Sequence, residues 1–429
     1  MADLFKSVTT QNALWAAWRH VRSRGRDSDS DDIRAQVEVF DREPMRYLRA
    51  MQHALRSERF VFAPQIGVPK KKPKKDSVRP LIVAPLENRI VQRALLEGLT
   101  TVPAIQGVLD TPTSFGARRK RGVDCAISLA VDTIRGGAVW YARSDIQGFF
   151  TKIPKSTVSA FVHRATANRR FARLFDAAMA VELENAAALG EDVAHFPTGD
   201  IGVAQGSSLS PLVGNILLKD LDALLNSRGI VCIRYIDDFL LLGTSKQNVA
   251  KAFQSAQEHL ARFEMEAYDP ASRSDKASFG QTAEGFDFLG CRVQPGLIQP
   301  SPKARAALKD GVRDLLKKGR TAMRRAKSGD LGAAQRYVQT LVTLDLKLRG
   351  WVDAYYFCNG QQCLAALDGW IDDQLSMFDR EAHRLLADGS QVESRRVLGV
   401  RCLIDRHQEK HRDLPRCDSN ATAKDLAST

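Results

Sequence analysis

The chain has 429 residues, of which 44% are hydrophobic and 26% are charged, a balance typical of a folded protein with two or three packed units. Lys and Arg outnumber Asp and Glu by 63 to 50, and the resulting net charge of +13 points to a polyanionic partner. Seven scattered cysteines, no apolar signal core and no membrane-length apolar stretch argue against secreted and membrane classes. The sequence therefore predicts a soluble, cytoplasmic protein with reduced thiols and no membrane partner.

The first part of the chain alternates helical patterns with polar segments. Apolar residues at helical spacing predict helices over 10–25 and 42–60, with an exposed polar loop after the first. Two short apolar runs at 65–69 and 79–85 then enclose a lysine-rich stretch, which predicts a β-hairpin with a basic tip. A solvated loop is the alternative explanation, and charge alone favours it.

The middle of the chain alternates short strand patterns with helical ones, which indicates an α+β fold around a sheet. Strands are predicted at 138–146, 231–242 and 286–293, and helices at 208–225 and 246–263. Beyond residue 301 the pattern is mainly helical with a dense basic face, and the polar segment from Asp413 predicts a disordered tail.

Two adjacent acids, Asp237 and Asp238, interrupt an apolar run and predict a hairpin with its two-residue turn at this pair. A polar hairpin tip is the ordinary explanation. A third acid, Asp145, ends the strand at 138–146 in a similar apolar setting. If the two strands are neighbours, Asp145 and Asp237 converge, and close carboxylates repel one another unless a cation lies between them. Oxygen ligands without nearby His or Cys select Mg²⁺, with Mn²⁺ as an alternative.

Two such ions activate a 3′-hydroxyl and stabilise a leaving pyrophosphate, so the carboxylates favour nucleotidyl transfer. The sequence also resembles bacterial reverse transcriptases of the group II intron-like kind. The segments that carry the resemblance are, in chain order, VPKKK with RPLIVAPLENRIVQRALL, SFGARRKRG, SDIQGFF, GVAQGSSLSPLVGNILL, YIDD, GFDFLGC and LRGWVDAYY. They extend over roughly residues 10–360, and their order is more specific than any one of them.

The resemblance implies a right-hand polymerase of the α+β class, with fingers, a palm built on an antiparallel sheet flanked by helices, and a helical thumb. The expected divisions are an N-terminal helical extension at 1–40, fingers at 41–110, the palm with catalytic site and primer grip at 111–300 (part of the fingers inserted), a maturase-like thumb at 301–375, a C-terminal helical extension at 376–412 and a disordered tail at 413–429.

The resemblance also implies a catalytic set. Asp145 and Asp237 would bind two Mg²⁺ or Mn²⁺ ions, with Asp238 a weaker ligand and the carbonyl of Ile146 completing one coordination shell. Phe150 would be the steric gate that excludes a ribose 2′-hydroxyl, which selects dNTPs over ribonucleotides.

The implied nucleotide-binding residues are Arg79, Gln205, Gly206 and Lys276. An arginine suits the triphosphate because it contacts oxygens bidentately, and a glycine permits close approach of the backbone. The lysine is a candidate general acid for pyrophosphate, and a solvated loop lysine is the alternative.

Template RNA and the cDNA product would contact a set of basic residues: Lys70, Lys71, Lys72, Arg118, Lys317, Lys318, Arg324 and Arg325. For this set, a solvated charged face is the alternative. The primer grip would consist of Phe288, Leu289 and Gly290, for which a core strand is the alternative. A structural zinc site is a weaker hypothesis, because its four residues are irregularly spaced: Cys402, His407, His411 and Cys417.

The predicted function is RNA-directed DNA synthesis. Since nuclease, retron and diversity-generating signatures are not found, the sequence is most similar to stand-alone enzymes of the "unknown group", which copy a structured non-coding RNA in antiphage defence. Template-independent or protein-primed DNA synthesis on the same palm is an alternative. A maturase-like RNA-binding protein with a vestigial polymerase site is an alternative of another class. The sequence does not indicate an oligomeric state.

Overall fold

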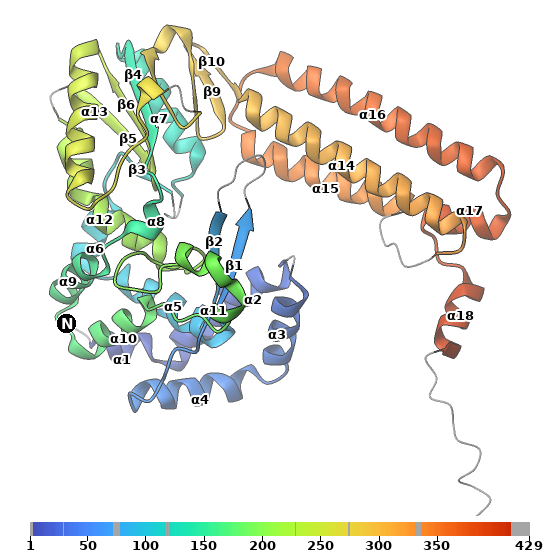
Figure 1. Ribbon diagram of the computed structural model, residues 1–429, viewed down its shortest axis with the longest axis horizontal. Helices are drawn as coiled ribbons and strands as arrows, with labels where there is room; N and C mark the ends of the chain where they lie inside the picture. Colours follow the sequence, from blue (N-terminus) through green and yellow to red (C-terminus); the bar gives the residue numbers. More distant parts are fainter. Residues whose placement is uncertain are drawn as a thin grey trace, which may run out of the picture. The chain divides into compact units, whose positions relative to one another are not determined.

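The computed structural model describes residues 3–28, 30–71, 78–116, 118, 120–227, 229–272, 275–330 and 336–412 (Figure 1). The chain divides into two compact units. The first contains Met1–Leu289 and Val293–Pro295, and the second contains Gly290–Arg292 and Gly296–Thr429. The observed division therefore precedes the expected boundary at residue 300.

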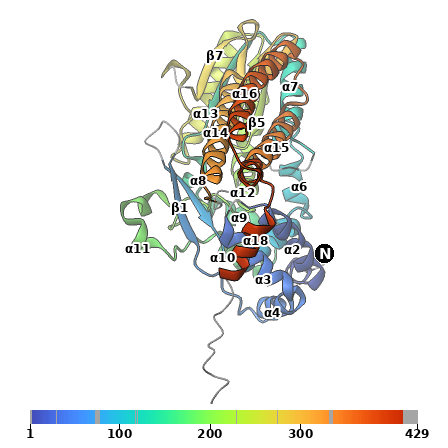
Figure 2. The same ribbon diagram turned by 90° about the vertical axis from the view of Figure 1, so that its right-hand side faces the viewer.

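The N-terminal helices are α1 (Leu4–Val8), α2 (Gln11–Arg26), α3 (Asp31–Arg42) and α4 (Pro44–Arg56). They lie together in Figure 1, and Figure 2 shows the same for α2, α3 and α4; α1 and α2 contact α5 (Leu86–Leu99). The helices predicted from apolar spacing correspond to α2 and α4, so these predictions are confirmed. The loop expected after α2 ends early, because Ser30 accepts a hydrogen bond from the amide of Ile33 and caps α3. The boundary expected at residue 40 consequently falls inside α3.

The predicted hairpin is confirmed: β1 (Ile66–Lys71) pairs with β2 (Val78–Val83) in antiparallel register. Lys71 lies opposite Val78 at the end of the described pairing. The expected basic tip falls on residues 72–77, outside the described residues.

A five-stranded sheet forms the centre of the first unit, in the order β3-β5-β6-β4-β7. Its strands are β3 (Ser114–Phe115), β4 (Trp140–Asp145), β5 (Ile230–Tyr235), β6 (Asp238–Gly243) and β7 (Ala277–Gln281). The pair β3–β5 is parallel and the other pairs are antiparallel. The sheet is therefore mixed rather than wholly antiparallel, because the chain from β3 to β5 passes through helices and another strand before it returns.

Helices bury the sheet. α7 (Val123–Arg135) and α12 (Ser210–Leu225) contact β5, and α13 (Lys246–Ala261) contacts β4 and β6 (Figure 1). Residues 239–242 of β6 are 0% exposed, which explains why this strand is a continuous apolar run. The predicted strands at β4, β5 and β6 and the predicted helices α12 and α13 are confirmed.

The remaining elements of the first unit connect these layers. They are α6 (Pro103–Leu109), α8 (Phe149–Lys152), α9 (Lys155–Thr166), α10 (Arg169–Met179), α11 (Ala186–Leu189), η1 (Gly190–His195), η2 (Pro270–Ser272), η3 (Thr282–Glu284) and β8 (Phe286–Phe288). The chain then passes through β9 (Cys291–Gln294) and β10 (Leu297–Pro300).

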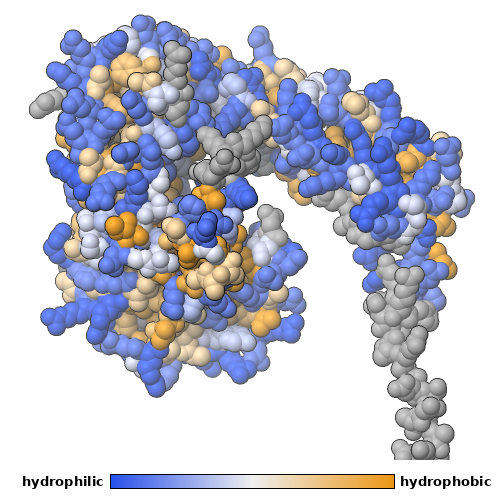
Figure 3. Space-filling model, in the orientation of Figure 1, coloured by the Kyte–Doolittle hydropathy of each residue, from blue (hydrophilic) through white to orange (hydrophobic). Residues whose placement is uncertain are grey.

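The second unit is helical, as expected beyond residue 301. Its helices are α14 (Pro302–Lys327), α15 (Tyr337–Tyr355), α16 (Gln361–Ala387), α17 (Gln391–Leu398) and α18 (Leu403–Arg412). Their common core contains Leu316 and Phe378, and the surface over them is mostly hydrophilic in Figure 3. α16 continues through residue 375 without a break, so the boundary expected there falls inside a helix. The predicted tail at 413–429 lies outside the described residues.

Two further expectations from the sequence concern membrane-spanning helices and the state of the cysteines. No helix in the described part is long and apolar enough to cross a membrane. The cysteines of that part are free thiols, as the scattered spacing predicted: Cys125, Cys232, Cys291, Cys358, Cys363 and Cys402.

Candidate active site

The turn between β5 and β6 lies one residue earlier than predicted. Tyr235 pairs with Asp238, so the two turn residues are Ile236 and Asp237, and Asp238 is the first residue of β6. Ile236 has a φ of 61°, a left-handed conformation that is rare for a β-branched side chain. The two aspartates are thus not equivalent, because one lies in the turn and the other in a paired strand.

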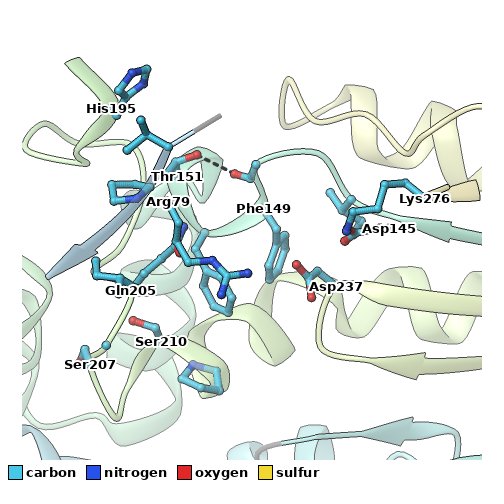
Figure 4. A pocket seen from close by; sticks show the side chains of 18 of the residues that line it. Arg79, Asp145, Phe149, Thr151, His195, Gln205, Ser207, Ser210, Asp237 and Lys276 are labelled. Atoms are coloured by element: carbon cyan, nitrogen blue, oxygen red, sulfur yellow. Dashed lines mark hydrogen bonds and ion pairs between the residues drawn. The ribbon is translucent and has the colours of Figure 1, made fainter. Parts of the chain in front are cut away.

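Asp145 lies next to this turn. The register of β4 and β6 pairs Asp145 with Asp238, and the amide of Ile146 donates to the carbonyl of Asp237 over 3.1 Å. Asp145 and Asp237 line the same pocket, of about 460 Å³, and Asp238 is not among the residues that line it (Figure 4). The expected convergence of Asp145 and Asp237 is therefore present in the fold.

The pocket also contains the other residues expected to bind metal or nucleotide: Arg79, Ile146, Phe150, Gln205, Gly206 and Lys276. Sequence reasoning missed several further residues of its lining: Phe149, Thr151, His195, Ser207, Ser210, Pro211 and Tyr268. Ser210 and Pro211 lie within one of the segments that carry the resemblance. His195 ends η1 and Tyr268 lies in an irregular segment, and no sequence pattern marks either of them.

Backbone contacts fix the loops on both sides of the pocket. The amide of Val203 donates to the carbonyl of Phe150 over 2.7 Å, and the amide of Ile82 donates to the carbonyl of Gln205 over 2.9 Å. Gly206 has a φ of 129°, and a Cβ there would lie 2.6 Å from the carbonyl oxygen of Ile82. Only glycine fits this approach of the loop to β2.

The carboxylates of the site carry unfavourable charge. Burial, and then repulsion from Asp145, raise the pKa of Asp237 to about 6 and that of Asp238 to about 7. Lys276 forms an ion pair with Asp145. Burial alone lowers the pKa of Lys276, but its hydrogen bond to Asp145 and the charge of that carboxylate raise it overall. The side chain of Arg79 points towards Asp237 in Figure 4 and favours the charged form of that acid.

The residues present fit a magnesium site. In the part of the chain that the structure describes, no group of three or more His, Cys, Asp or Glu side chains is arranged to hold a metal. The pocket instead offers the two carboxylates of Asp145 and Asp237 next to an open volume. Mg²⁺ is commonly bound in this way, through one or two carboxylates with water and substrate phosphates completing its shell.

The predicted primer grip forms a tight turn at the end of β8. Phe288 is fully buried, as the alternative of a core strand required. Leu289 and Gly290 both have positive φ angles, of 48° and 79°, the pattern of a two-residue type I′ turn. The backbone at this position is therefore sharply bent.

The predicted nucleic-acid contacts differ in their environment. Lys70, Lys71, Lys317 and Lys318 are exposed, and Lys72 lies outside the described residues. Arg118 is half-buried and donates to the carbonyls of Thr111 and Ser114.

Two of the predicted basic contacts are already paired. Arg324 pairs with Glu381 at 2.7 Å and Arg325 with Asp330 at 2.5 Å. The exposed lysines of α14 are therefore more available to a polyanion than these two arginines.

The hypothetical zinc residues are only partly described. Cys402 is buried and its thiol donates to the carbonyl of Val392. The side chain of His411 and all of Cys417 lie outside the described residues.

Comparison with known proteins gives related sequences and structures. The profile of the family described as "Reverse transcriptase (RNA-dependent DNA polymerase)" matches residues 68–293. Protein YkfC of Escherichia coli strain K12 is 24% identical over 268 residues, which are 54% of this chain and 66% of that protein. An "Uncharacterized 91 kDa protein in cob intron" of Schizosaccharomyces pombe is 30% identical over 171 residues, which are 39% of this chain and 20% of that protein.

Among solved structures, a "Partial Cas6-RT-Cas1--Cas2 complex" aligns with a TM-score of 0.35 and 21% identity. The alignment covers 60% of this chain and 41% of that one. The chain thus spans at most 66% of the length of the relatives named above.

Proposed function

Because this chain belongs to the reverse transcriptase (RNA-dependent DNA polymerase) family, we propose that its pocket adds dNTPs to a 3′-hydroxyl by two-metal-ion nucleotidyl transfer. The observation that supports this mechanism is the position of Asp145 and Asp237, which line one pocket although helices α8 to α12 and strand β5 lie between them in the chain. Polymerisation is the activity of the family. For this chain we propose the use of two metal ions, the kind of template and the biological role.

Each residue of the pocket has a proposed task. Asp145 and Asp237, with the carbonyl of Ile146, would hold two Mg²⁺ ions, for which Mn²⁺ is a substitute. Bound there, such ions activate the attacking hydroxyl and stabilise the leaving pyrophosphate. Asp238 would act on the site through charge, because it does not line the pocket.

The nucleotide would be held by the residues around the carboxylates. Arg79 reaches into the pocket from β2 and would bind triphosphate oxygens bidentately. Gln205 and Gly206 would lie against the nucleotide and the template. Lys276 neutralises Asp145 in this structure, and a triphosphate would offer its ammonium a second anion.

The template and primer would lie along basic surfaces. We propose that the exposed Lys70 and Lys71 of β1 and Lys317 and Lys318 of α14 contact the phosphate backbone of the RNA template and cDNA product. The turn at Leu289 and Gly290 would hold the primer end.

The biological role is proposed from the sequence resemblance to stand-alone enzymes. The template would be a structured non-coding RNA, and the product would serve antiphage defence in the cytoplasm. Sequencing the nucleic acid that co-purifies with the protein tests this: one strongly enriched RNA is expected, and a sample of bulk cellular RNA would contradict it.

A primer-extension assay tests the reaction itself. With a heteropolymeric RNA template, each single dNTP should be incorporated only opposite its complement, and synthesis should stop without RNA. Homopolymer made without RNA would instead identify template-independent synthesis. A product that stays attached to protein until protease is added would identify protein priming.

Replacing Phe150 by alanine should admit ribonucleotides. The aromatic ring lines the pocket and packs against the ring of Phe149, so it occupies space beside the nucleotide. Its removal should lower the preference for dCTP over CTP by roughly 10- to 100-fold, the discrimination that one steric contact supplies. The ratio of kcat/KM for the two substrates measures this effect.

The control for the gate is Phe149→Leu, which replaces the neighbouring aromatic ring by another apolar side chain. It should leave the preference for dCTP unchanged. An unaltered preference in Phe150→Ala would show that the ring does not face the ribose.

A further inference from the structure

Arg234 is a buried charged residue of the central sheet. It lies on β5, two residues before the turn that carries Asp237, and it is 1% exposed. Its partner Asp222 on α12 is 2% exposed. A fully buried ion pair costs desolvation energy and gives little stability by itself, so its presence beside the turn calls for a physical explanation.

Every N–H of the Arg234 guanidinium has an acceptor. Nε and Nη2 donate to the two carboxylate oxygens of Asp222 over 2.7 and 2.6 Å, and Nη2 also donates to Ser114 over 2.9 Å. Nη1 donates to Asn215 over 2.9 Å and to the carbonyl of Ile236 over 2.8 Å. Since a guanidinium has five N–H groups, its hydrogen-bonding capacity is fully used and its orientation is fixed.

The bond to Ile236 connects this group to the strained residue of the turn. Ile236 is held at a φ of 61°, a strained conformation that a β-branched residue adopts only when its surroundings enforce it. Its amide also donates to the carbonyl of Phe115 over 3.3 Å. On the other side, a Cβ on Gly116 would lie 2.8 Å from Cγ1 of Ile236, so only glycine leaves room for this side chain.

We propose that Arg234 is a positioning residue that sets the place of Asp237 through the carbonyl of Ile236. Asp222 and Asn215 anchor the guanidinium on α12, the helix that begins directly after the loop of Gln205 and Gly206. The network therefore joins the turn, β3 and α12 into one rigid frame. The proposal rests on the proposed function in one respect, the role of Asp237 as a metal ligand.

Arg234→Lys is the decisive variant. Lysine keeps the charge opposite Asp222 but lacks the planar fork, so it cannot reproduce the bond to Ile236 together with the others. We expect kcat for primer extension to fall roughly 10- to 100-fold, as a misplacement of about 1 Å does, with KM for primer-template and dNTP within about two-fold of wild type. Mn²⁺ binding measured by electron paramagnetic resonance without nucleic acid should weaken in parallel.

Two variants separate positioning from general destabilisation. Ser114→Ala removes one acceptor of Nη2 but leaves the bond of Nη1 to Ile236 in place, so it should lower kcat less than Arg234→Lys. Leu218→Ala makes a cavity in α12, where the side chain is fully buried, and serves as a control for loss of melting temperature. If Leu218→Ala lowers kcat and Mn²⁺ affinity as much as Arg234→Lys at the same loss of melting temperature, the proposal is overturned.

A milder variant covers the case in which Arg234→Lys does not fold. Asn215→Ala removes the second acceptor of Nη1, the nitrogen that also donates to Ile236, and it should lower kcat several-fold. A wild-type kcat in this variant would then overturn the proposal. A different result would show that the proposed role of Asp237 as a metal ligand is wrong. If Asp237→Asn is fully active, Asp237 is not a ligand, and the network around Arg234 is only a structural feature.

Discussion

Asp237→Asn should reduce the rate of primer extension by roughly 10³- to 10⁴-fold, which corresponds to a loss of several kcal/mol of transition-state stabilisation. The substitution keeps the size and shape of the side chain but removes the charge that would hold the metal ions. Asp237 lies in the turn and lines the pocket, so no other carboxylate at that position replaces it. Single-turnover incorporation of one dNTP at saturating Mg²⁺ measures the loss.

Asp238→Asn should have a smaller effect, roughly 10- to 100-fold, because Asp238 lies in β6 opposite Asp145 and does not line the pocket. Circular dichroism should show wild-type folding for both variants. Equal losses in the two variants would contradict the difference that the turn geometry predicts, and a larger loss in Asp238→Asn would reverse the assignment.

The same substitutions decide between polymerisation and RNA binding as the biological activity. If the chain acts in antiphage defence through cDNA synthesis, Asp237→Asn should abolish protection in a plaque assay. Protection that persists at the wild-type level would identify a maturase-like RNA-binding role with an unused polymerase site.

The convergence of Asp145 and Asp237 could be predicted from the sequence, because each lies at the end of an apolar run. Apolar runs on both sides of Asp145 and Asp237 predict strands, and strand ends are where side chains of neighbouring strands converge. The turn position could not be predicted, because the register is set by cross-strand pairing of Tyr235 with Asp238 rather than by residue type. Proline and glycine, which usually mark a turn, do not occur there.

The frame around Arg234 could not be predicted for a different reason. An arginine inside the apolar run VCIRYI and an aspartate inside LLKDLDALL are visible signals, but each alone reads as a surface charge. Their bond depends on the packing of α12 against β5, which periodicity does not determine. The contact of Lys276 with Asp145 likewise joins residues whose spacing in the sequence carries no information about their pairing.

The metal-free protein should lose stability as the pH rises from 5 to 8. The pKa values of Asp237 and Asp238 are raised to about 6 and about 7, above the ordinary value of 3.8 that applies to the unfolded chain. The folded state therefore binds more protons than the unfolded state between pH 3.8 and these raised values. The associated stability is fully present below pH 3.8 and is lost as the pH rises from there through 6 and 7. Between pH 5 and 8 the loss is about one pKa unit for Asp237 and about two for Asp238, which together amount to about 4 kcal/mol.

The double variant Asp237→Asn with Asp238→Asn isolates this effect, because an amide does not ionise. In EDTA at pH 8 it should unfold at a higher urea concentration than the wild type. The difference should be smaller at pH 5 and should nearly vanish below pH 3.8, where both aspartates are protonated in the folded and the unfolded state. Glu38→Gln, which removes an exposed partner of Arg42, should show no such pH-dependent difference.

Mg²⁺ provides the complementary test, since a cation that binds only the folded site stabilises the folded state. At pH 8 it should raise the stability of the wild type and narrow the gap to the double variant. A double variant no more stable than the wild type in EDTA at pH 8 would mean that the apolar strands do not hold these acids against mutual repulsion. The adjacent acids would then be an ordinary polar turn, and the electrostatic argument for a metal site would fail with it.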